Sequence, residues 1–146
     1  IVLSRWPMVT IVDWEISLAY PIDGNNLTRL FALNSERAKF FEKISQKTLT
    51  SIENFIVSKE GGYSVADTTG KRIFYAPDPI AIAVVLDSDV ITRSEQRYVT
   101  VETASRLSRG QSMVDWMGFS GKTPNANLVT EISTEQFLQI VEKALS

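Results

Sequence analysis

The sequence predicts an α/β domain in which strands and helices pack in layers, and three observations predict it. The chain has 146 residues, 44% of them hydrophobic and 22% charged, which is typical of one globular domain. Segments rich in β-branched residues alternate with segments whose apolar residues recur at helical spacing. No internal repeat or low-complexity tract interrupts this alternation. Such a mixture indicates a layered α/β domain, or half of one.

The first element expected is a buried strand over residues 8–14. Val9 and Ile11 are β-branched and favour extended backbone, and Pro7 stands at the strand's start, where a missing N–H donor is tolerated. A stretch rich in turn-forming residues over 20–26 follows, so we expect the strand to end before it.

Two helices are expected next. The spacing of Leu27 and Leu30 predicts a short helix that ends near Asn34. From residue 35 to about 59 the apolar residues share one face, which predicts a long amphipathic helix. We expect Asn34 to cap this helix and the two glycines at 61–62 to end it.

Residues 60–77 predict a loop with a short strand near 73–75. Because this loop has few apolar anchors, we expect it to be mobile and to fold over a ligand. Asp78 and Pro79 then predict a helix start, with Asp78 as the N-cap and proline in the first turn. The apolar run over 80–86 has no polar face, which predicts a helix that is buried all round.

The last third of the chain predicts three strands and a helix. The strands are expected over residues 97–103, 111–117 and 127–132. Residues 133–136 have the pattern of a capping box and predict the start of the final helix. The inner face of that helix is expected to comprise Phe137, Ile140, Val141 and Ala144.

The absence of two residue types restricts the chemistry. The chain has no cysteine and no histidine, so it cannot supply a thiolate nucleophile, a Ser-His-Asp triad or an imidazole metal site. Any chemistry must use carboxylates, hydroxyls, amines or a hard metal ion with oxygen ligands. The lack of cysteine favours the cytoplasm, with secretion as the alternative.

Charge and hydropathy argue against two classes of partner. The net charge of -2 and the pI near 5.2 give no basic surface for nucleic acid. The longest apolar run, over residues 80–86, is far shorter than a membrane span of about 20 residues, so we expect no membrane insertion.

Several residues have both a structural and a functional interpretation. Asp78 is either a helix cap or a carboxylate that holds a hard cation such as calcium. Trp14 and Glu15 either line a pocket at the end of the first strand or form a core tryptophan beside a surface glutamate. Tyr63 and Tyr75 either close over a ligand or pack the loop down onto the domain.

Three stretches, taken in this order, resemble one family. They are residues 8–15, residues 75–83 with the sequence Tyr-Ala-Pro-Asp-Pro before an apolar helix, and residues 101–137. Together they are similar to the C-terminal half of the inosine-uridine preferring nucleoside hydrolases, the nucleoside N-ribohydrolases, and in particular to animal-type members. The resemblance implies that residues 1–146 are the C-terminal portion of a single domain, an open α/β sheet flanked by helices.

The resemblance also implies an activity, the hydrolysis of the N-glycosidic bond of ribonucleosides to free base and ribose. In the family, calcium binds the ribose and most of its ligands come from an N-terminal Asp-x-Asp-x-x-x-Asp-Asp motif. That motif is absent here, so the resemblance transfers one metal ligand, Asp78, and predicts a fragment that is inactive alone. It further implies a small-molecule nucleoside substrate and a homo-oligomeric full-length protein.

The residue before the aspartate departs from the family pattern. Many members have histidine there, which helps to protonate the leaving base, whereas this chain has Pro77. The proline ring can pack against a base but carries no proton, so the donor is expected to be Tyr63, Tyr75 or solvent. Tyr63 and Pro77 are the candidate substrate-binding residues, and no catalytic residue is assigned. The alternative is a member of the fold that binds or interacts without catalysis.

Overall fold

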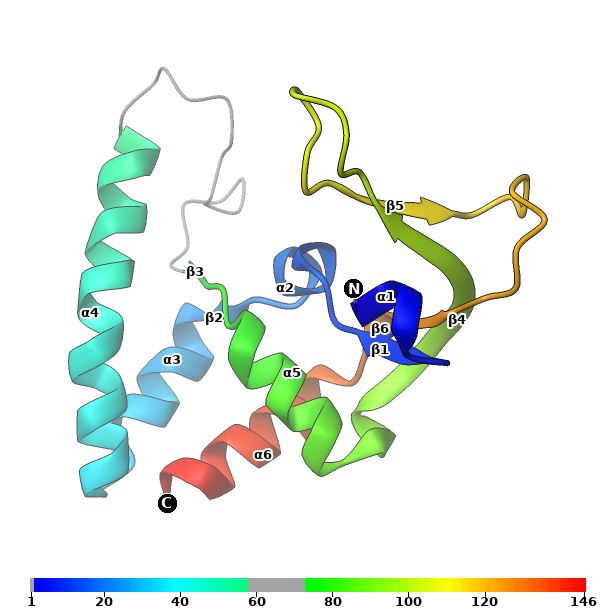
Figure 1. The fold of residues 1–146 in the computed structure, drawn as a ribbon. Helices are drawn as coiled ribbons and strands as arrows, with labels where there is room; N and C mark the ends of the chain where they lie inside the picture. The colour runs from blue at the N-terminus through cyan, green and yellow to red at the C-terminus, as the bar shows by residue number, and fades with distance from the viewer. Residues whose placement is uncertain (1, 58–72) are drawn as a thin grey trace.

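The computed structural model describes residues 2–57 and 73–146, and it confirms an α/β fold in which helices flank a sheet (Figure 1). In the described part of the chain, β1, β6, β4 and β5 form a four-stranded sheet in that order, and β2 and β3 form a separate pair. The elements are α1 (Val2–Arg5), β1 (Val9–Ile11), α2 (Trp14–Ala19), β2 (Ile22–Asp23), α3 (Gly24–Phe31), α4 (Glu36–Val57), β3 (Ile73–Phe74), α5 (Pro77–Leu86), a 3-10 turn η1 (Ser88–Val90), β4 (Ile91–Val101), β5 (Ser112–Asp115), β6 (Ala126–Ile132) and α6 (Thr134–Leu145).

The sheet is mixed. Strand β1 runs parallel to β6, with Val9 opposite Ala126, whereas β4 is antiparallel to both β6 and β5. Helices α3, α4, α5 and α6 gather on one side of the molecule, and the β4–β5 hairpin projects away from them (Figure 1). The sheet therefore joins a helical body to an extended hairpin.

Asn125 ties the N-terminal segment to this sheet. Its side-chain oxygen accepts a hydrogen bond from the Val99 N–H at 2.7 Å, and its side-chain nitrogen donates to the carbonyls of Leu3 at 2.7 Å and Val99 at 2.9 Å. Its backbone carbonyl accepts from the Val9 N–H at 3.0 Å. One residue thus anchors α1, β1 and β4 before β6 begins.

The main core lies between the helices and β6. Buried apolar residues from α2, α3, α4, α5, β6 and α6 form one cluster. Its most enclosed members include Leu30, Ile80, Val90 and Phe137. A smaller cluster of Val99, Ala126 and Leu128 fills the sheet side. The described residues include no helix long and apolar enough to cross a membrane.

The first strand is shorter than the sequence predicts. Strand β1 covers Val9–Ile11, and the chain turns into a helix at Trp14, within the predicted strand. The cause is Asp13, whose carboxylate accepts a hydrogen bond from the Ile16 N–H at 3.1 Å and caps α2. The prediction of a strand up to residue 14 is therefore wrong.

Helix α4 begins close to its predicted start, but a different residue caps it. The Ser35 hydroxyl, and not Asn34, accepts a hydrogen bond from the Ala38 N–H at 3.0 Å. The same hydroxyl donates to the Leu145 carbonyl, which joins the start of α4 to the end of α6. The predicted stop at residues 61–62 lies outside the described residues.

Helix α5 is buried on one side only. Ile80, Ala83 and Val84 are buried, but Val85 is 79% exposed and Leu86 is 69% exposed. The prediction of burial all round is wrong for the described structure, because the core covers only one face of the helix.

The C-terminal elements follow the prediction with shifted boundaries. Strand β4 begins at Ile91, six residues before the predicted start, because pairing with β6 holds its polar first half. The final helix has the predicted cap, since the Ser133 hydroxyl accepts from the Gln136 N–H at 3.3 Å. Leu138 joins Phe137 on the buried face, whereas Ala144 is exposed.

Candidate functional site

The candidate site is the corner where α5 begins. Pro77 is the first residue of α5 and is half-buried, and Asp78 is the second and is exposed. Ala76 occupies the N-cap position, and no side-chain hydrogen bond caps the helix. The prediction that Asp78 is the cap is therefore wrong.

The two prolines explain why this helix start lacks a side-chain cap. Pro77 and Pro79 have no backbone N–H, so among the first three residues of α5 only Asp78 carries a backbone donor. The Ile80 N–H, which follows, already bonds to the Ala76 carbonyl at 3.0 Å. The Asp78 carboxylate is therefore not needed to hold the helix start.

An aromatic pair lies beside this corner. Trp14, from the start of α2, and Tyr75, which follows β3, have ring centroids 6.0 Å apart and ring planes inclined by 51°. Trp14 is 55% exposed, so the interpretation of it as a core tryptophan is wrong. Burial raises the pKa of the Tyr75 hydroxyl above its ordinary value.

The neighbouring residue Phe74 has a packing role. Its ring packs edge-on against the ring of Phe41, with 5.8 Å between the ring centroids. Phe41 in turn packs against Phe31, with 5.6 Å between their ring centroids. This chain of rings joins β3 to α4 and α3 at the margin of the core. Tyr63 and the predicted lid lie outside the described residues, apart from the lid's last residues at 73–77.

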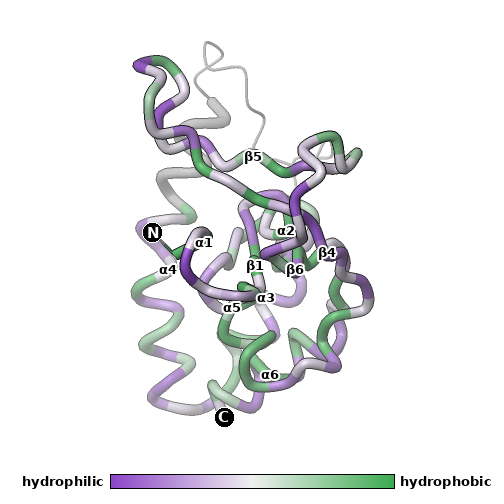
Figure 2. The backbone as a smooth tube through the Cα atoms, turned by 45° about the vertical axis from the view of Figure 1, so that its right-hand side comes forward, coloured by the Kyte–Doolittle hydropathy of each residue, from purple (hydrophilic) through white to green (hydrophobic). Residues whose placement is uncertain are grey.

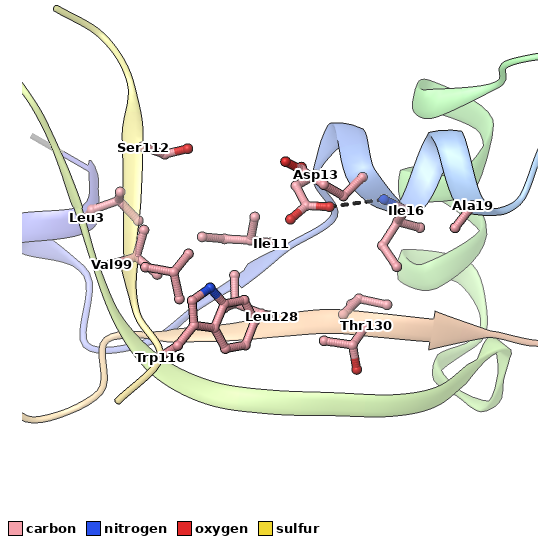
Figure 3. Close-up of a pocket in the computed structure, with 13 residues that line it drawn as sticks. Leu3, Ile11, Asp13, Ile16, Ala19, Val99, Ser112, Trp116, Leu128 and Thr130 are labelled. Atoms are coloured by element: carbon pink, nitrogen blue, oxygen red, sulfur yellow. Dashed lines mark hydrogen bonds between the residues drawn. The ribbon is translucent and has the colours of Figure 1, made fainter. Parts of the chain in front are cut away.

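A cavity of about 510 Å³ opens over the sheet next to α2. Ile11, Val99 and Leu128 line it with apolar side chains, and Asp13, at the start of α2, and Trp116 line it as well (Figure 3). Glu15 also lines this cavity, whereas its neighbour Trp14 pairs with Tyr75. The start of α2 thus contributes Glu15 and Ile16 to the cavity and Trp14 to the corner at α5.

The hairpin holds a separate group of polar contacts. The Lys122 ammonium donates a hydrogen bond to the Tyr98 hydroxyl at 3.0 Å and lies 4.7 Å from the centre of the Tyr98 ring. This hydrogen bond lowers the pKa of Tyr98. The Arg97 guanidinium lies 5.8 Å from the centre of the Trp116 ring. These contacts hold Trp116 and the β5–β6 connection, which carries Lys122, against strand β4 of the hairpin.

Comparison with known proteins identifies the family and the fold. The sequence profile described as inosine-uridine preferring nucleoside hydrolase matches residues 1–139. The chain belongs to this family. The match covers both strand β1 and the Asp78-Pro79 start of α5, so the resemblance inferred from the three stretches is confirmed.

Individual nucleoside hydrolases align with parts of the chain. The pyrimidine-specific ribonucleoside hydrolase RihA of Klebsiella pneumoniae subsp. pneumoniae is 32% identical over 69 residues, which is 47% of this chain and 22% of that protein. The RihA protein of an Enterobacter species is 23% identical over 125 residues, which is 86% of this chain and 38% of that protein. The chain therefore spans well under half the length of these relatives.

Solved structures of nucleoside hydrolases share the fold. An inosine-guanosine nucleoside hydrolase superposes with a TM-score of 0.70 at 23% identity, covering 94% of this chain and 38% of its own. A purine-preferring ribonucleoside hydrolase from Gardnerella vaginalis superposes with a TM-score of 0.67 at 17% identity, covering 94% of this chain and 39% of its own. Nearly all of this chain therefore has the architecture of part of a nucleoside hydrolase.

The described residues do not form a calcium site by themselves. They contain no group of three or more His, Cys, Asp or Glu side chains that could hold a metal ion. Calcium takes six to eight oxygen ligands, and the corner offers the single carboxylate of Asp78. The chemistry of this donor suits calcium, but the number of donors does not.

Proposed function

We propose that this chain is the C-terminal portion of a single nucleoside hydrolase domain that cleaves ribonucleosides to free base and ribose. The observation that carries the proposal is the exposed Asp78 carboxylate at the start of α5, inside the region that matches the family. Because this carboxylate does not cap the helix, it is available to a ligand. Both the exposure and the absence of a capping role support a site residue.

Within this proposal, Asp78 gives one oxygen ligand to a calcium ion. The other ligands come from residues beyond this chain, since the relatives are more than twice as long as the segment that aligns with them. Pro77 offers an apolar ring surface to the substrate beside the carboxylate.

The leaving base needs a hydrogen-bond donor that Pro77 cannot supply. Tyr75 stands two residues before Pro77, and its hydroxyl, like that of any tyrosine, is protonated at neutral pH and can donate a hydrogen bond. We assign Tyr75 as the donor to the base, with Tyr63 as the alternative. Tyr75→Phe in the full-length protein should lower kcat and leave calcium affinity unchanged.

The test of Asp78 uses the full-length protein with the substitution Asp78→Asn. Calcium affinity, measured by calorimetric titration, should fall by about tenfold or more, and ribose release should fall with it. Thermal melts should hardly change, because Asp78 satisfies no helix donor.

Asp89→Asn is the matched control, since it removes an exposed carboxylate just beyond the other end of α5. It should leave both calcium binding and turnover unchanged. Unchanged calcium affinity in a well-folded Asp78→Asn protein would remove Asp78 from the site.

A second candidate function is nucleoside binding without hydrolysis. Pro77 favours it, because a proline at this position cannot protonate a leaving group. Full-length protein that binds inosine in a calorimeter but releases no reducing sugar from inosine or uridine would establish this alternative. Residues 1–146 expressed alone should be inactive in either case, because one carboxylate does not complete the shell of a calcium ion.

The full-length protein should also assemble as a homo-oligomer. Exposed apolar side chains on the two loops that flank β5 support this proposal, with Leu107 98% exposed before β5 and Phe119 87% exposed after it. Light scattering coupled to size-exclusion chromatography measures the assembly, and a monomeric mass at micromolar concentration would refute it.

A further inference from the structure

Strand β5 lies at one end of the sheet. Among the described residues it pairs with β4 alone, because the strand order is β1, β6, β4, β5, and the hairpin that carries it projects away from the helices (Figure 1). The Gln111 carbonyl, next to β5, accepts a hydrogen bond from the Glu102 N–H, next to β4, at 3.0 Å. Since alternate residues of a strand direct their backbone groups to the same side, Ser112 and Val114 direct theirs away from β4. They form an edge on which another strand can pair.

The loops on either side of β5 hold apolar side chains in solvent. Leu107, in the loop before β5, is 98% exposed, and Phe119, in the loop after it, is 87% exposed. In the first loop the Glu102 carboxylate accepts a hydrogen bond from the Ser105 N–H at 3.0 Å, and the Ser105 hydroxyl accepts one from the Leu107 N–H at 3.2 Å. In the second loop the Asp115 carboxylate accepts from the Phe119 N–H at 2.9 Å. Both side chains thus stand on an ordered backbone, so a partner that covers them loses little affinity to ordering these loops.

The two ends of β5 carry opposite charges. Arg106 and Arg109 precede the strand, and Asp115 is its last residue. Within the described residues neither arginine forms a salt bridge. Antiparallel pairing places the start of one strand beside the end of the other, so the arginines of each copy approach the Asp115 carboxylate of the other copy. The charge pattern of this edge is therefore complementary to itself.

The side chains of β5 favour one register for such a pair. Residues that face each other across a two-fold axis lie on the same side of the sheet, so the axis passes through Met113 or Val114. Centring on Met113 places this 44% exposed side chain opposite its own copy and Ser112 opposite the partner's Val114. Centring on Val114 places Met113 opposite a charged carboxylate, the partner's Asp115. The first register is favoured because it sets apolar against apolar.

The rest of the domain belongs at the other end of the sheet. Under the proposed function that part of the protein precedes this chain, and it enters through α1 into β1. Strand β1 is the end strand opposite to β5. The edge of β5 is thus left for a partner outside the domain.

We propose that β5 pairs in antiparallel fashion with the β5 strand of a second copy of the protein, with Met113 at the two-fold axis. The loops at 102–111 and 116–125 pack their apolar side chains against the partner. This inference rests on the proposed function, because it takes the homo-oligomer of the full-length protein as the assembled form, and it names the surface that forms it. Four residues of strand give few hydrogen bonds, so Leu107 and Phe119 supply most of the buried apolar area.

The first experiment cross-links the full-length protein. Met113→Cys should give a disulfide-linked dimer on mild oxidation, because opposite residues of antiparallel strands have Cα atoms about 4.5–5.5 Å apart, within the range of disulfides. Residues 1–146 contain no cysteine, and wild-type protein treated in the same way controls for thiols elsewhere. Met8→Cys is the matched control, since Met8 is 42% exposed and lies outside β5, and it should stay unlinked on a non-reducing gel.

The second experiment breaks the same contact without a covalent bond. Met113→Glu places two like charges opposite each other and should raise the dissociation constant of the dimer by about tenfold or more in analytical ultracentrifugation. Phe119→Ala should weaken the dimer as well, because it removes an apolar contact beside the strand. Met8→Glu should leave the dissociation constant unchanged.

The outcomes separate the interface from the function on which it rests. A wild-type oligomer that Met113→Cys does not cross-link and Met113→Glu does not weaken overturns the β5 interface and leaves the hydrolase standing. A monomeric wild-type protein that releases ribose does the same. A dimer cross-linked through Met113→Cys that releases no reducing sugar from inosine or uridine supports the interface and refutes the hydrolase. Circular dichroism melts of each variant exclude unfolding as the cause.

Discussion

Helices α5 and α6 rest on the same core but meet solvent in opposite ways. Helix α6 buries Phe137 and Leu138 and presents mainly polar side chains outward. Helix α5 buries Ile80 on the core side and is hydrophobic on its outer side as well, where Val85 is 79% exposed. Figure 2 shows α5 as an almost continuous hydrophobic stretch, whereas α4 alternates between hydrophilic and hydrophobic residues.

The difference shows which surfaces of the chain are suited to water. A helix that is apolar all round is typical of an element enclosed by protein on every side. The structures that share this fold extend far beyond the part that superposes, since this chain covers 38% of one and 39% of another. We infer that the outer face of α5 is an internal surface of the complete domain, whereas the outer face of α6 is a true exterior.

The largest expected loss of stability comes from a substitution on the inner face of α6. Phe137 is 1% exposed, so Phe137→Ala should destabilise the protein by about 3–5 kcal/mol through the cavity that it leaves. Urea denaturation measures the change in the free energy of unfolding. Gln139→Ala, on the exposed side of the same helix, should stay within about 0.5 kcal/mol of wild type. Equal effects of the two substitutions would contradict the assignment of faces.

The next largest loss of stability is expected on the inner face of α5, and it tests whether this face belongs to the core as the inner face of α6 does. Ile80 is fully buried, so Ile80→Ala should cost about 2–5 kcal/mol in urea denaturation. Ile82→Ala removes the same atoms from a position that is 57% exposed and should cost far less in the chain of residues 1–146. A large cost at Ile82 in this chain would mean that the outer face is already covered.

The two helix starts should differ by a smaller amount. Ser133→Ala removes the cap of α6 and should cost about 1 kcal/mol. Asp78→Ala at the start of α5 should cost less than about 0.5 kcal/mol, because its carboxylate makes no capping bond. Thr134→Ala, next to the cap, controls for a change in helix propensity. Thermal melts that rank Asp78→Ala above Ser133→Ala in cost would restore the capping role of Asp78.

The smallest expected change in stability comes from a substitution on the outer face of α5, and it tests how this face differs from the outer face of α6. Val85→Lys in residues 1–146 should change the free energy of unfolding by less than about 0.5 kcal/mol and reduce self-association in analytical ultracentrifugation. In the full-length protein the same lysine should be clearly destabilising, since it would bury an unpaired charge. An equal, negligible effect in both forms would show that this face is exposed in the complete domain as well.

Sequence patterns predicted the elements whose stability is local. The final helix was predicted with its cap because Ser133 and the apolar spacing after it lie within a few residues of each other. The early half of β4 was missed because residues 91–97 are mostly polar, and only pairing with the distant β6 makes them a strand.

The site was predicted as a set of residues and not as an arrangement. Asp78 and Pro77 were proposed as site residues from the family pattern. The exposure of Trp14 and its contact with Tyr75, in contrast, depend on tertiary packing between α2 and the segment before α5. The one local signal for this geometry was Asp13, an N-cap residue followed by Glu15 in the first turn. It would have ended the strand early and moved Trp14 onto a helix.

The parallel pairing of β1 with β6 also determines how late in translation β1 can enter the sheet. Val9 leaves the ribosome 117 residues before Ala126, its partner in the sheet. At translation rates of about 5–20 residues per second, β1 waits about 6–23 seconds for the strand that completes its hydrogen bonds. During that interval α3, α4 and the β4–β5 hairpin can form from local contacts, whereas the pairing of β1 with β6 cannot. A nascent chain stalled before β6 therefore presents the edge of β1 and the apolar side of α5 to chaperones, and this edge is paired only once β6 has been made.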